Sequence, residues 1–240
     1  MSKSTVFAIA AAAAVASLPA LAAPQVPDDG FIPNFAVNSD ILCAWHGGVQ
    51  GFAATRNVEN KNTGRVTEMD ARRFDAYVGY DVTRWMTVYA LGGVLSAKDK
   101  GEWLESDTET VWGAGVWLSL LDDDQLDVLS TVSRYRLTAG VEVSRGDPND
   151  LAWTQIDGFL TFELVNDIYL TELIFPTQVG VYAGPVFSKI DLDGYDQEGD
   201  NDWGFTLGLD LRFANGMYAQ GAYDWFSDDS VLSFSAGFRF

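Results

Sequence analysis

The chain has few residues of the types that build most active sites and cross-links. It contains one cysteine, Cys43, and one histidine, His46, among 240 residues. A single cysteine cannot form an internal disulfide, so we interpret Cys43 as incidental. Basic residues are scarce too, with 15 Lys and Arg against 34 Asp and Glu and a formal net charge of −19. A chain this acidic lacks the basic patches that phosphate contacts need, which argues against nucleic acid as a partner.

Long apolar runs are missing except at the N-terminus. Residues 1–22 carry one cation, Lys3, an apolar run from Val6 to Leu18 and a small-residue Ala20-Leu21-Ala22 site, which together predict a secretory signal peptide. No later run approaches the ~18 apolar residues that a spanning helix needs. If the mature chain lies in a membrane, it must therefore cross as a closed β-barrel, the other structure that satisfies every backbone polar group in lipid.

What the sequence does contain is strict alternation of apolar and polar residues, the pattern of strands with one apolar and one polar face. In the last segment the apolar face carries Leu232, Phe234, Ala236, Phe238 and Phe240, and the polar face carries Ser233, Ser235, Gly237 and Arg239. Upstream, Trp203 to Phe213 alternates in the same way and is followed by Ala214-Asn215-Gly216, a tight-turn signal.

Reading this pattern along the chain predicts about ten strands, within a range of about eight to twelve. We place them at roughly 41–54, 73–80, 86–95, 109–120, 125–145, 151–164, 178–188, 203–213, 217–225 and 230–240. Segment 125–145 is too long for one register and predicts a bulge near Ser133-Arg134-Tyr135.

The gaps between these strands alternate in length, as periplasmic turns and outer loops do. The short gaps are 82–84, 121–124 and 214–216, and the long polar gaps are 55–68, 98–108 and 190–202; 165–176 and 226–229 fit the alternation poorly. Aromatic residues also sort into two predicted girdles. The periplasmic girdle contains Tyr80, Trp85, Phe213, Phe238 and Phe240, and the outer girdle contains Phe74, Trp203, Tyr223 and Trp225.

Alternation alone does not separate a lipid-facing barrel from a soluble periplasmic barrel that binds a ligand. Three features favour the membrane: the aromatic end at Phe240, polar faces rich in Gly, Ser and charge, and apolar runs of about nine to eleven residues, the length of a tilted spanning strand. The predicted fold class is an all-β, transmembrane, antiparallel up-and-down barrel over residues 41–240, preceded by a periplasmic extension over residues 23–40.

At this point the chain resembles the small bacterial outer-membrane barrels of the OmpA and OmpX kind. The resemblance is carried by the YDVTRW turn, the alternating MTVYALGGV that follows it and the SFSAGFRF close. It implies residence in the outer membrane among lipid and lipopolysaccharide, with Phe238 and Phe240 as the insertion signal for the barrel assembly machinery. Larger OmpA proteins append a peptidoglycan-binding domain, which this chain does not show.

His46 is the one candidate catalytic base. Barrel enzymes place a histidine beside Ser or Asp near the outer rim, whereas His46 precedes Gly47-Gly48 and lies in the lower half of its strand. A nucleophile and base could still pair across strands. We favour a hydrogen-bonded lumen histidine, and we predict no enzymatic activity.

Six charged residues project inward on the predicted register, and they would need partners inside a low-dielectric wall. They are Arg73, Asp75, Asp210, Arg212, Asp224 and Arg239. A barrel of about ten strands is only modestly wider than one that side chains fill. The sequence therefore predicts a largely plugged lumen and a structural or surface-interaction role, with a narrow porin-like channel as the alternative.

The segment DLDGYDQEGDND holds carboxylates at close spacing, which could wrap a hard cation such as calcium weakly. The candidate ligands are Asp191, Asp193, Asp196, Glu198 and Asp200. The spacing departs from the EF-hand pattern, and a solvated acidic loop is the simpler interpretation. No other cofactor is predicted.

Overall fold

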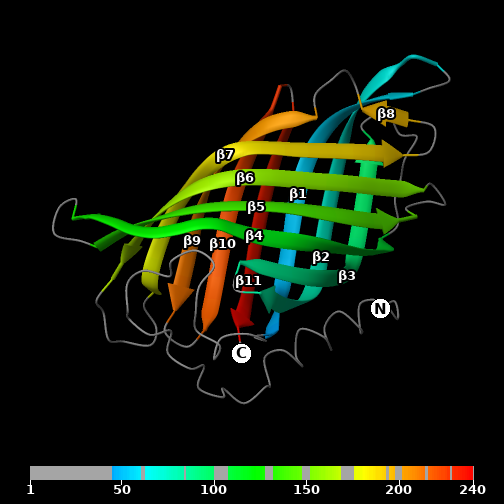
Figure 1. Ribbon diagram of the computed structural model, residues 1–240. Coiled ribbons are helices and arrows are strands. Elements are labelled where there is room, and N and C mark those ends of the chain that lie inside the picture. Colours follow the sequence, from blue (N-terminus) through cyan, green and yellow to red (C-terminus); the bar gives the residue numbers. More distant parts are fainter. Residues whose placement is uncertain are drawn as a thin grey trace.

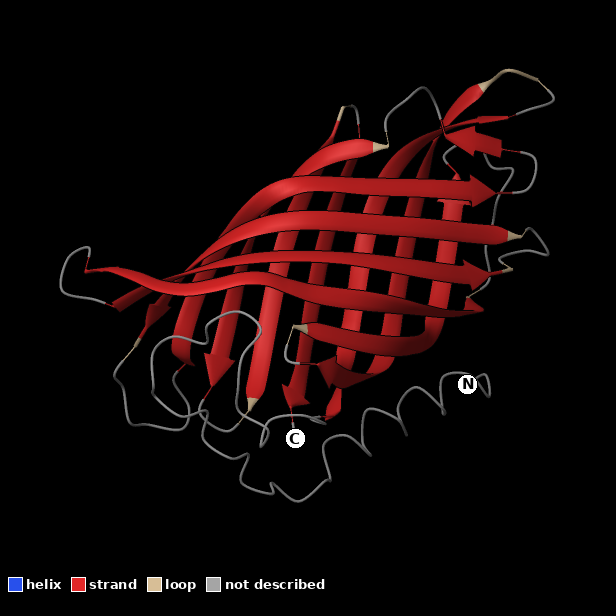
Figure 2. Ribbon diagram, viewed as in Figure 1, coloured by secondary structure: helices blue, strands red, loops and turns tan. Residues whose placement is uncertain are grey.

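The computed structural model describes the chain from residue 45 to residue 239 with short gaps. The described ranges are 45–60, 63–83, 85–99, 108–127, 132–147, 152–168, 176–192, 195–197, 202–213, 216–227 and 229–239. Strands make up nearly all of them (Figure 2). Within these ranges no helix is long and apolar enough to cross a membrane. The predicted signal peptide and periplasmic extension lie outside the described residues, as does Cys43.

The strands form a closed, antiparallel, ten-stranded up-and-down barrel, which confirms the predicted fold class. Its members are β1 (Trp45–Asn60), β2 (Val66–Thr83), β3 (Met86–Asp99), β4 (Glu109–Asp127), β5 (Val132–Gly146), β6 (Trp153–Asp167), β7 (Pro176–Leu192), β9 (Trp203–Phe213), β10 (Met217–Phe226) and β11 (Asp229–Arg239). Each pairs with the next along the chain, and β11 returns to β1 from His46↔Arg239 to Thr55↔Ser230. Figure 1 shows β4 to β7 crossing in front of the other strands.

One short strand lies outside this circuit. β8 (Tyr195–Gln197) pairs with Val58–Asn60 of β1 and, through Tyr195, with Leu192 of β7. β1 continues past its last pair with β11, Thr55↔Ser230, and β7 continues past its last pair with β9, Phe187↔Trp203. β8 therefore bridges β7 and β1 beyond the ends of β9, β10 and β11, and the circuit at this rim is β1 to β7 plus β8 (Figure 1).

The strand pairing corrects three details of the sequence prediction. The irregularity expected at Ser133-Arg134-Tyr135 lies instead on the neighbouring strand β4, between Ser119 and Leu121 and again between Asp124 and Asp127. β5 pairs with β6 in one continuous register. Residues 121–124, predicted as a turn, belong to β4, which continues to Asp127 and stays paired with β5 through Asp122↔Arg136 and Asp124↔Arg134.

The hairpin of β1 and β2 is also longer than predicted. Most of segment 55–68, expected as a loop, is strand, because the ladder extends to Glu59↔Val66. Phe74 consequently pairs with Gly51 and Val94 near the middle of β2 and not at a strand end, and its place in the outer girdle stays a prediction. Tyr80, Phe213, Phe238, Trp203, Tyr223 and Trp225 do lie near strand ends.

The two faces of the wall differ sharply in chemistry. Outward positions expose large apolar side chains, including Val78, Val141, Phe162, Leu207, Leu209, Leu232 and Phe234. Inward positions on the same strands bury polar and charged groups, including Arg73, Asp75, Arg136, Ser144, Glu163, Thr206 and Asp210. A water-soluble barrel places its apolar face inside, so this distribution is inverted relative to a soluble fold.

The largest apolar cluster lies inside the barrel at the β8 rim. It comprises Ala54, Val58, Met69, Ala71, Leu95, Ala97, Val111, Trp153, Ile190 and Leu192. These residues occupy inward positions where the circuit has narrowed, and Trp153, Met69, Leu95 and Val111 are fully buried. We refer to this cluster as the apolar plug.

Candidate functional site in the barrel lumen

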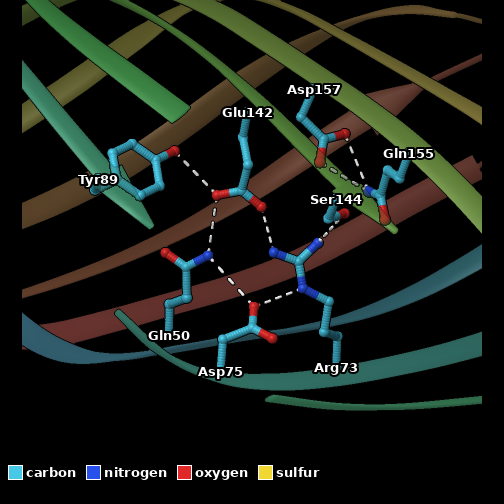
Figure 3. Close-up of polar contacts among 8 residues, drawn as sticks. All are labelled: Gln50, Arg73, Asp75, Tyr89, Glu142, Ser144, Gln155 and Asp157. Atoms are coloured by element: carbon cyan, nitrogen blue, oxygen red, sulfur yellow. Dashed lines mark hydrogen bonds and ion pairs between the residues drawn. The ribbon is translucent and has the colours of Figure 1, made fainter. Parts of the chain in front are cut away.

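A hydrogen-bonded cluster of charged and polar side chains occupies the lumen below the apolar plug (Figure 3). Arg73 of β2 is its centre. The Arg73 Nε donates to Asp75 Oδ2 at 2.5 Å, Nη1 donates to Ser144 Oγ at 2.8 Å, and Nη2 pairs with Glu142. Glu142 also accepts hydrogen bonds from Tyr89 Oη at 3.0 Å and Gln50 Nε2 at 3.1 Å. We call this set, with Asp75 and Ser144, the central network.

The central network crosses the lumen. Arg73 lies on β2 and Gln50 on β1, whereas Glu142 and Ser144 lie on β5, and β3 and β4 separate them in the wall. Their hydrogen bonds therefore cross the barrel interior, as Figure 3 shows. Beside them on β6, Gln155 donates to both carboxylate oxygens of Asp157, at 3.0 and 2.8 Å. Hydrogen bonds from an arginine guanidinium to carboxylates are strong and geometrically specific. Because Arg73 bonds groups on both β2 and β5, it fixes these two sides of the barrel relative to each other.

A second charged cluster joins β5, β6 and β9. Arg136 Nη1 lies 2.9 Å from Glu163 Oε2 and 3.8 Å from Asp210 Oδ2. Asp210 also accepts from Arg212 Nε at 2.9 Å. Arg136, Glu163 and Asp210 are all buried, and burying such charges is tolerable only when they are paired.

A third cluster lies at the end of the barrel opposite β8, across the closure of the sheet. Asp81 of β2 is hydrogen-bonded to His46 Nε2 of β1 at 2.7 Å and to Thr87 Oγ1 of β3 at 2.5 Å. Its other oxygen accepts from Arg239 Nη2 of β11 at 2.9 Å. His46 and Arg239 are direct register partners across the junction of the first and last strands. One carboxylate thus ties four consecutive strands.

A fourth contact, nearer the plug, places Arg56 of β1 over the ring of Phe226, with 3.9 Å from the guanidinium carbon to the ring centroid. Arg56 Nη1 lies 3.7 Å from Asp229 Oδ2 of β11. Arg56 and Asp229 are both buried. Cation–π contact and a carboxylate within Coulomb range together stabilise this desolvated guanidinium.

A cavity of about 20 Å³ lies in the lumen beside His46, Tyr77, Tyr89, Trp117 and Tyr218. A volume of roughly 10–15 Å³ of this kind holds one water molecule, so this cavity suits a water and not a transported solute. Tyr77 and Tyr218 contact each other through their hydroxyl groups across β1 and β11.

The structure distributes the sequence-predicted lumen charges over several clusters. Arg73 and Arg212 each bond an aspartate two residues away on their own strand, and Arg239 bonds Asp81. Asp224 stands opposite Thr206 in the ladder of β10 and β9. His46 takes part in a charged cluster through its contact with Asp81.

Only two of the five predicted calcium ligands lie among the described residues. Asp191 lies in β7 and Asp196 in β8, opposite Glu59 of β1. Asp193, Glu198 and Asp200 lie outside the described residues. Among the residues that are described, no group of three or more His, Cys, Asp or Glu side chains could hold a metal ion. Phe240 is also outside the described ranges, while Phe238 stands opposite Gly47 and Met217.

Sequence reasoning missed several important members of these clusters: Gln50, Asp81, Glu142, Ser144, Arg136 and Glu163. Glu142, Ser144 and Arg136 have the same parity along β5, so inward alternation over residues 136–144 was the available signal. The predicted bulge in segment 125–145 obscures this signal. The sequence prediction ends the strand at Tyr80 and puts Asp81 beside a turn, where a charged residue is unremarkable, although Asp81 has the same strand parity as Asp75.

Comparison with known proteins gives only distant similarities. No family model and no curated protein matches the chain. An outer-membrane channel from Pseudomonas putida F1 is 10% identical, covering 89% of this chain and 98% of that chain with a TM-score of 0.41. The transport unit of the autotransporter AIDA-I from Escherichia coli is 9% identical, covering 86% and 93% with a TM-score of 0.39.

Ail, the attachment invasion locus protein of Yersinia pestis, is 11% identical, covering 82% of this chain and 99% of Ail with a TM-score of 0.24. All of these neighbours are outer-membrane β-barrels. At TM-scores this low they assign neither a family nor an activity to the chain. The resemblance to the OmpA and OmpX group accordingly stays a prediction.

Proposed function

We propose that this protein is an integral β-barrel of the bacterial outer membrane with a closed lumen and a structural or surface-interaction role. The apolar outer face supports membrane residence, because contiguous exposed apolar surface of this extent is rare on soluble monomers. The strands of the ten-stranded circuit have 10 to 19 residues, so each reaches or exceeds the roughly nine to eleven needed to span a bilayer when tilted. The β8 rim would face outward, and lipid and lipopolysaccharide would surround the wall.

The observation that carries the closed lumen is the set of hydrogen bonds from β1 and β2 to β5 through the barrel interior. A solute or hydrated ion would have to break buried, charge-assisted bonds to pass this level. The apolar plug obstructs the same path a second time at the β8 rim. Both features favour a plugged barrel over the narrow porin-like channel.

Membrane residence is tested by fractionating the cell envelope and comparing unheated with boiled samples on SDS gels. We expect the protein in the outer-membrane fraction and a heat-dependent change in mobility. Release with soluble periplasmic contents, together with mobility that does not depend on heating, would support the alternative of a soluble periplasmic binding barrel. Deleting Phe240 in parallel tests the insertion signal: the folded amount in cells should fall, while refolding of purified protein in detergent persists.

Planar-bilayer recording tests the closed lumen. We expect no reproducible openings from the wild-type protein. Discrete openings that change with Arg212→Ala or Asp210→Ala would instead establish the channel. His46→Ala should leave lipid and peptide turnover unchanged, since no enzymatic activity is proposed.

Weak calcium binding by the acidic segment 191–202 is a secondary proposal, carried over from the carboxylate spacing. Its test is protection of this segment from hydrogen exchange by millimolar calcium but not by matched sodium. Identical protection with calcium and with chelator would leave a solvated acidic loop.

A further inference from the structure

The strand β8 is held by a much shorter ladder than any strand of the ten-stranded circuit. It forms three residue pairs with β1, namely Val58↔Gln197, Glu59↔Asp196 and Asn60↔Tyr195, and one pair with β7, Leu192↔Tyr195. The closure of β1 on β11, by contrast, runs through ten consecutive pairs. Since strand pairing is cooperative along a ladder, local opening should begin at β8.

The middle pair of this short ladder sets two acidic residues opposite each other. Glu59 of β1 and Asp196 of β8 are register partners. Like charges directly opposite in an antiparallel pair destabilise it, whereas opposite charges or a neutral partner do not. The sequence thus weakens the contact that closes the circuit at this rim.

What β8 covers is apolar. Its partners Val58 and Leu192 are each 2% exposed and both belong to the apolar plug. Without β8, the ends of β1 and β7 would keep their partners β2 and β6 but would have no described strand on their facing edges, because β9 and β11 end their pairing lower in the barrel. Separation of β8 would therefore widen the rim and bring plug residues to the surface.

We propose that β8 is a releasable strap that closes the rim of the barrel and controls exposure of the apolar plug. In the closed state β8 completes a circuit of eight strands with β1 to β7, and side chains can fill the interior of a barrel of that size. In the released state the rim opens toward the ten-stranded circumference and presents Val58 and Leu192. The repulsion between Glu59 and the position of Asp196 sets the balance between the two states. This inference depends on strand register and not on membrane residence.

The decisive experiment locks the strap covalently. In a Cys43→Ser background, Glu59→Cys with Asp196→Cys places two cysteines at register-paired positions, where Cα atoms roughly 4.5–5.5 Å apart can form a disulfide. The control lock is Asn57→Cys with Glu68→Cys, a register pair of β1 and β2 at the same rim. Both proteins are compared in the oxidised and reduced states by amide hydrogen exchange in detergent micelles.

In the wild-type protein, the amides of residues 58–60 and 195–197 should exchange at least about tenfold faster than those of the β1 and β11 pairing. Oxidation of the strap lock should remove most of that difference, and oxidation of the control lock should not. Exchange equally slow in both regions of the wild-type protein, or equal protection by both locks, would overturn the proposal. Failure of the strap cysteines to oxidise would overturn it through the register itself.

Glu59→Gln tests the repulsion without a cross-link. It should slow exchange in residues 195–197, because an uncharged partner faces Asp196. Glu68→Gln removes the same charge from the neighbouring strand, opposite Asn57, and should leave that exchange unchanged. Equal effects of the two variants would show a general charge effect and would contradict control by the Glu59 pair.

Discussion

Asp81 illustrates, for a single residue, how the barrel wall is closed. Its two carboxylate oxygens bind His46, Thr87 and Arg239, so side chains from β1, β3 and β11 meet on one group of β2. Asp81 is buried, whereas Arg239 keeps 38% of its side chain exposed. Removing the carboxylate would leave three polar partners without their acceptor.

Asp81→Ala is therefore expected to lower the free energy of unfolding by about 2 kcal/mol, the usual cost of losing hydrogen bonds to a charged group. The measurement is the urea midpoint of gel-mobility unfolding. Asp70→Ala is the matched control, because Asp70 lies on the same strand and accepts one exposed hydrogen bond from Thr55. If the effect comes from the closure, a disulfide between Val49→Cys and Ala236→Cys, which are register partners of β1 and β11, should restore stability. Equal loss in both alanine variants would contradict the closure role.

Arg73 is expected to matter more, because it neutralises two buried carboxylates at once. Arg73→Ala would leave Asp75 and Glu142 facing each other without a cation, at a cost of about 3–5 kcal/mol. Arg73→Lys keeps the charge but loses the forked hydrogen bonds, so its stability should lie between those of the wild-type protein and Arg73→Ala. The unfolding midpoint in detergent measures both variants, and a lysine variant no better than alanine would show that geometry, not charge, governs the site.

The residue-level predictions depend on strand parity. Unbroken alternation surrounds Arg73, Asp75 and Asp210, so the sequence predicts a lumen position for each of them. It does not predict one for Glu142, because segment 125–145 is predicted as one long strand with a bulge. Which carboxylate binds which arginine depends on the distance across the lumen, which is set by tilt and stagger and is not encoded in local alternation.

Among the strands, β1 and β11 face each other at a pair of glycines. Gly48 and Gly237 are register partners. A Cβ at Gly48 would lie 2.6 Å from the Tyr77 hydroxyl and 2.8 Å from the Gly237 Cα, closer than van der Waals contact allows. The tyrosine hydroxyl groups of Tyr77 and Tyr218 occupy the space that side chains would need, so the glycines permit both the strand pairing and the tyrosine contact.

Gly48→Ala is thus expected to destabilise the barrel by about 1–3 kcal/mol through overpacking. Gly92→Ala is the control, since a Cβ there would meet only the Val111 carbonyl at 3.9 Å. The fraction of protein that keeps the compact, unheated mobility on gels measures the outcome. A Gly48 variant as stable as the Gly92 variant would show that the strands move apart without cost.

β8 shows what the sequence could not reveal about elements. Long alternating segments were found in the sequence because one apolar face repeats every second residue over ten or more positions. β8 has three residues and lies in a segment that the sequence predicts to be an acidic loop. Its place is fixed by pairing with β1 and β7, which lie far away in the sequence, and local pattern carries no information on such contacts.

Over the whole molecule, two layers of different side chains, one apolar and one charged, lie one above the other in the lumen. The apolar plug occupies the rim where β8 completes the circuit, and the central network crosses the barrel below it. In the closed lumen that we propose, the plug would exclude ions because it offers no polar partner, and the network would exclude apolar solutes because they would leave buried charges unpaired. Each layer alone would then block the path.

This arrangement predicts that conduction requires loss of both layers. Trp153→Ala removes the largest fully buried side chain of the plug, and Arg73→Ala with Glu142→Ala removes the bonds across the lumen without leaving Glu142 unpaired. We expect each change alone to leave planar bilayers silent, and the triple variant to give reproducible openings. Recordings at matched protein insertion, with heat-dependent gel mobility confirming a folded barrel, provide the comparison. Openings from Trp153→Ala alone would show that the central network is permeable, and silence from a folded triple variant would place a further obstruction in the remaining clusters around Arg136 or Asp81.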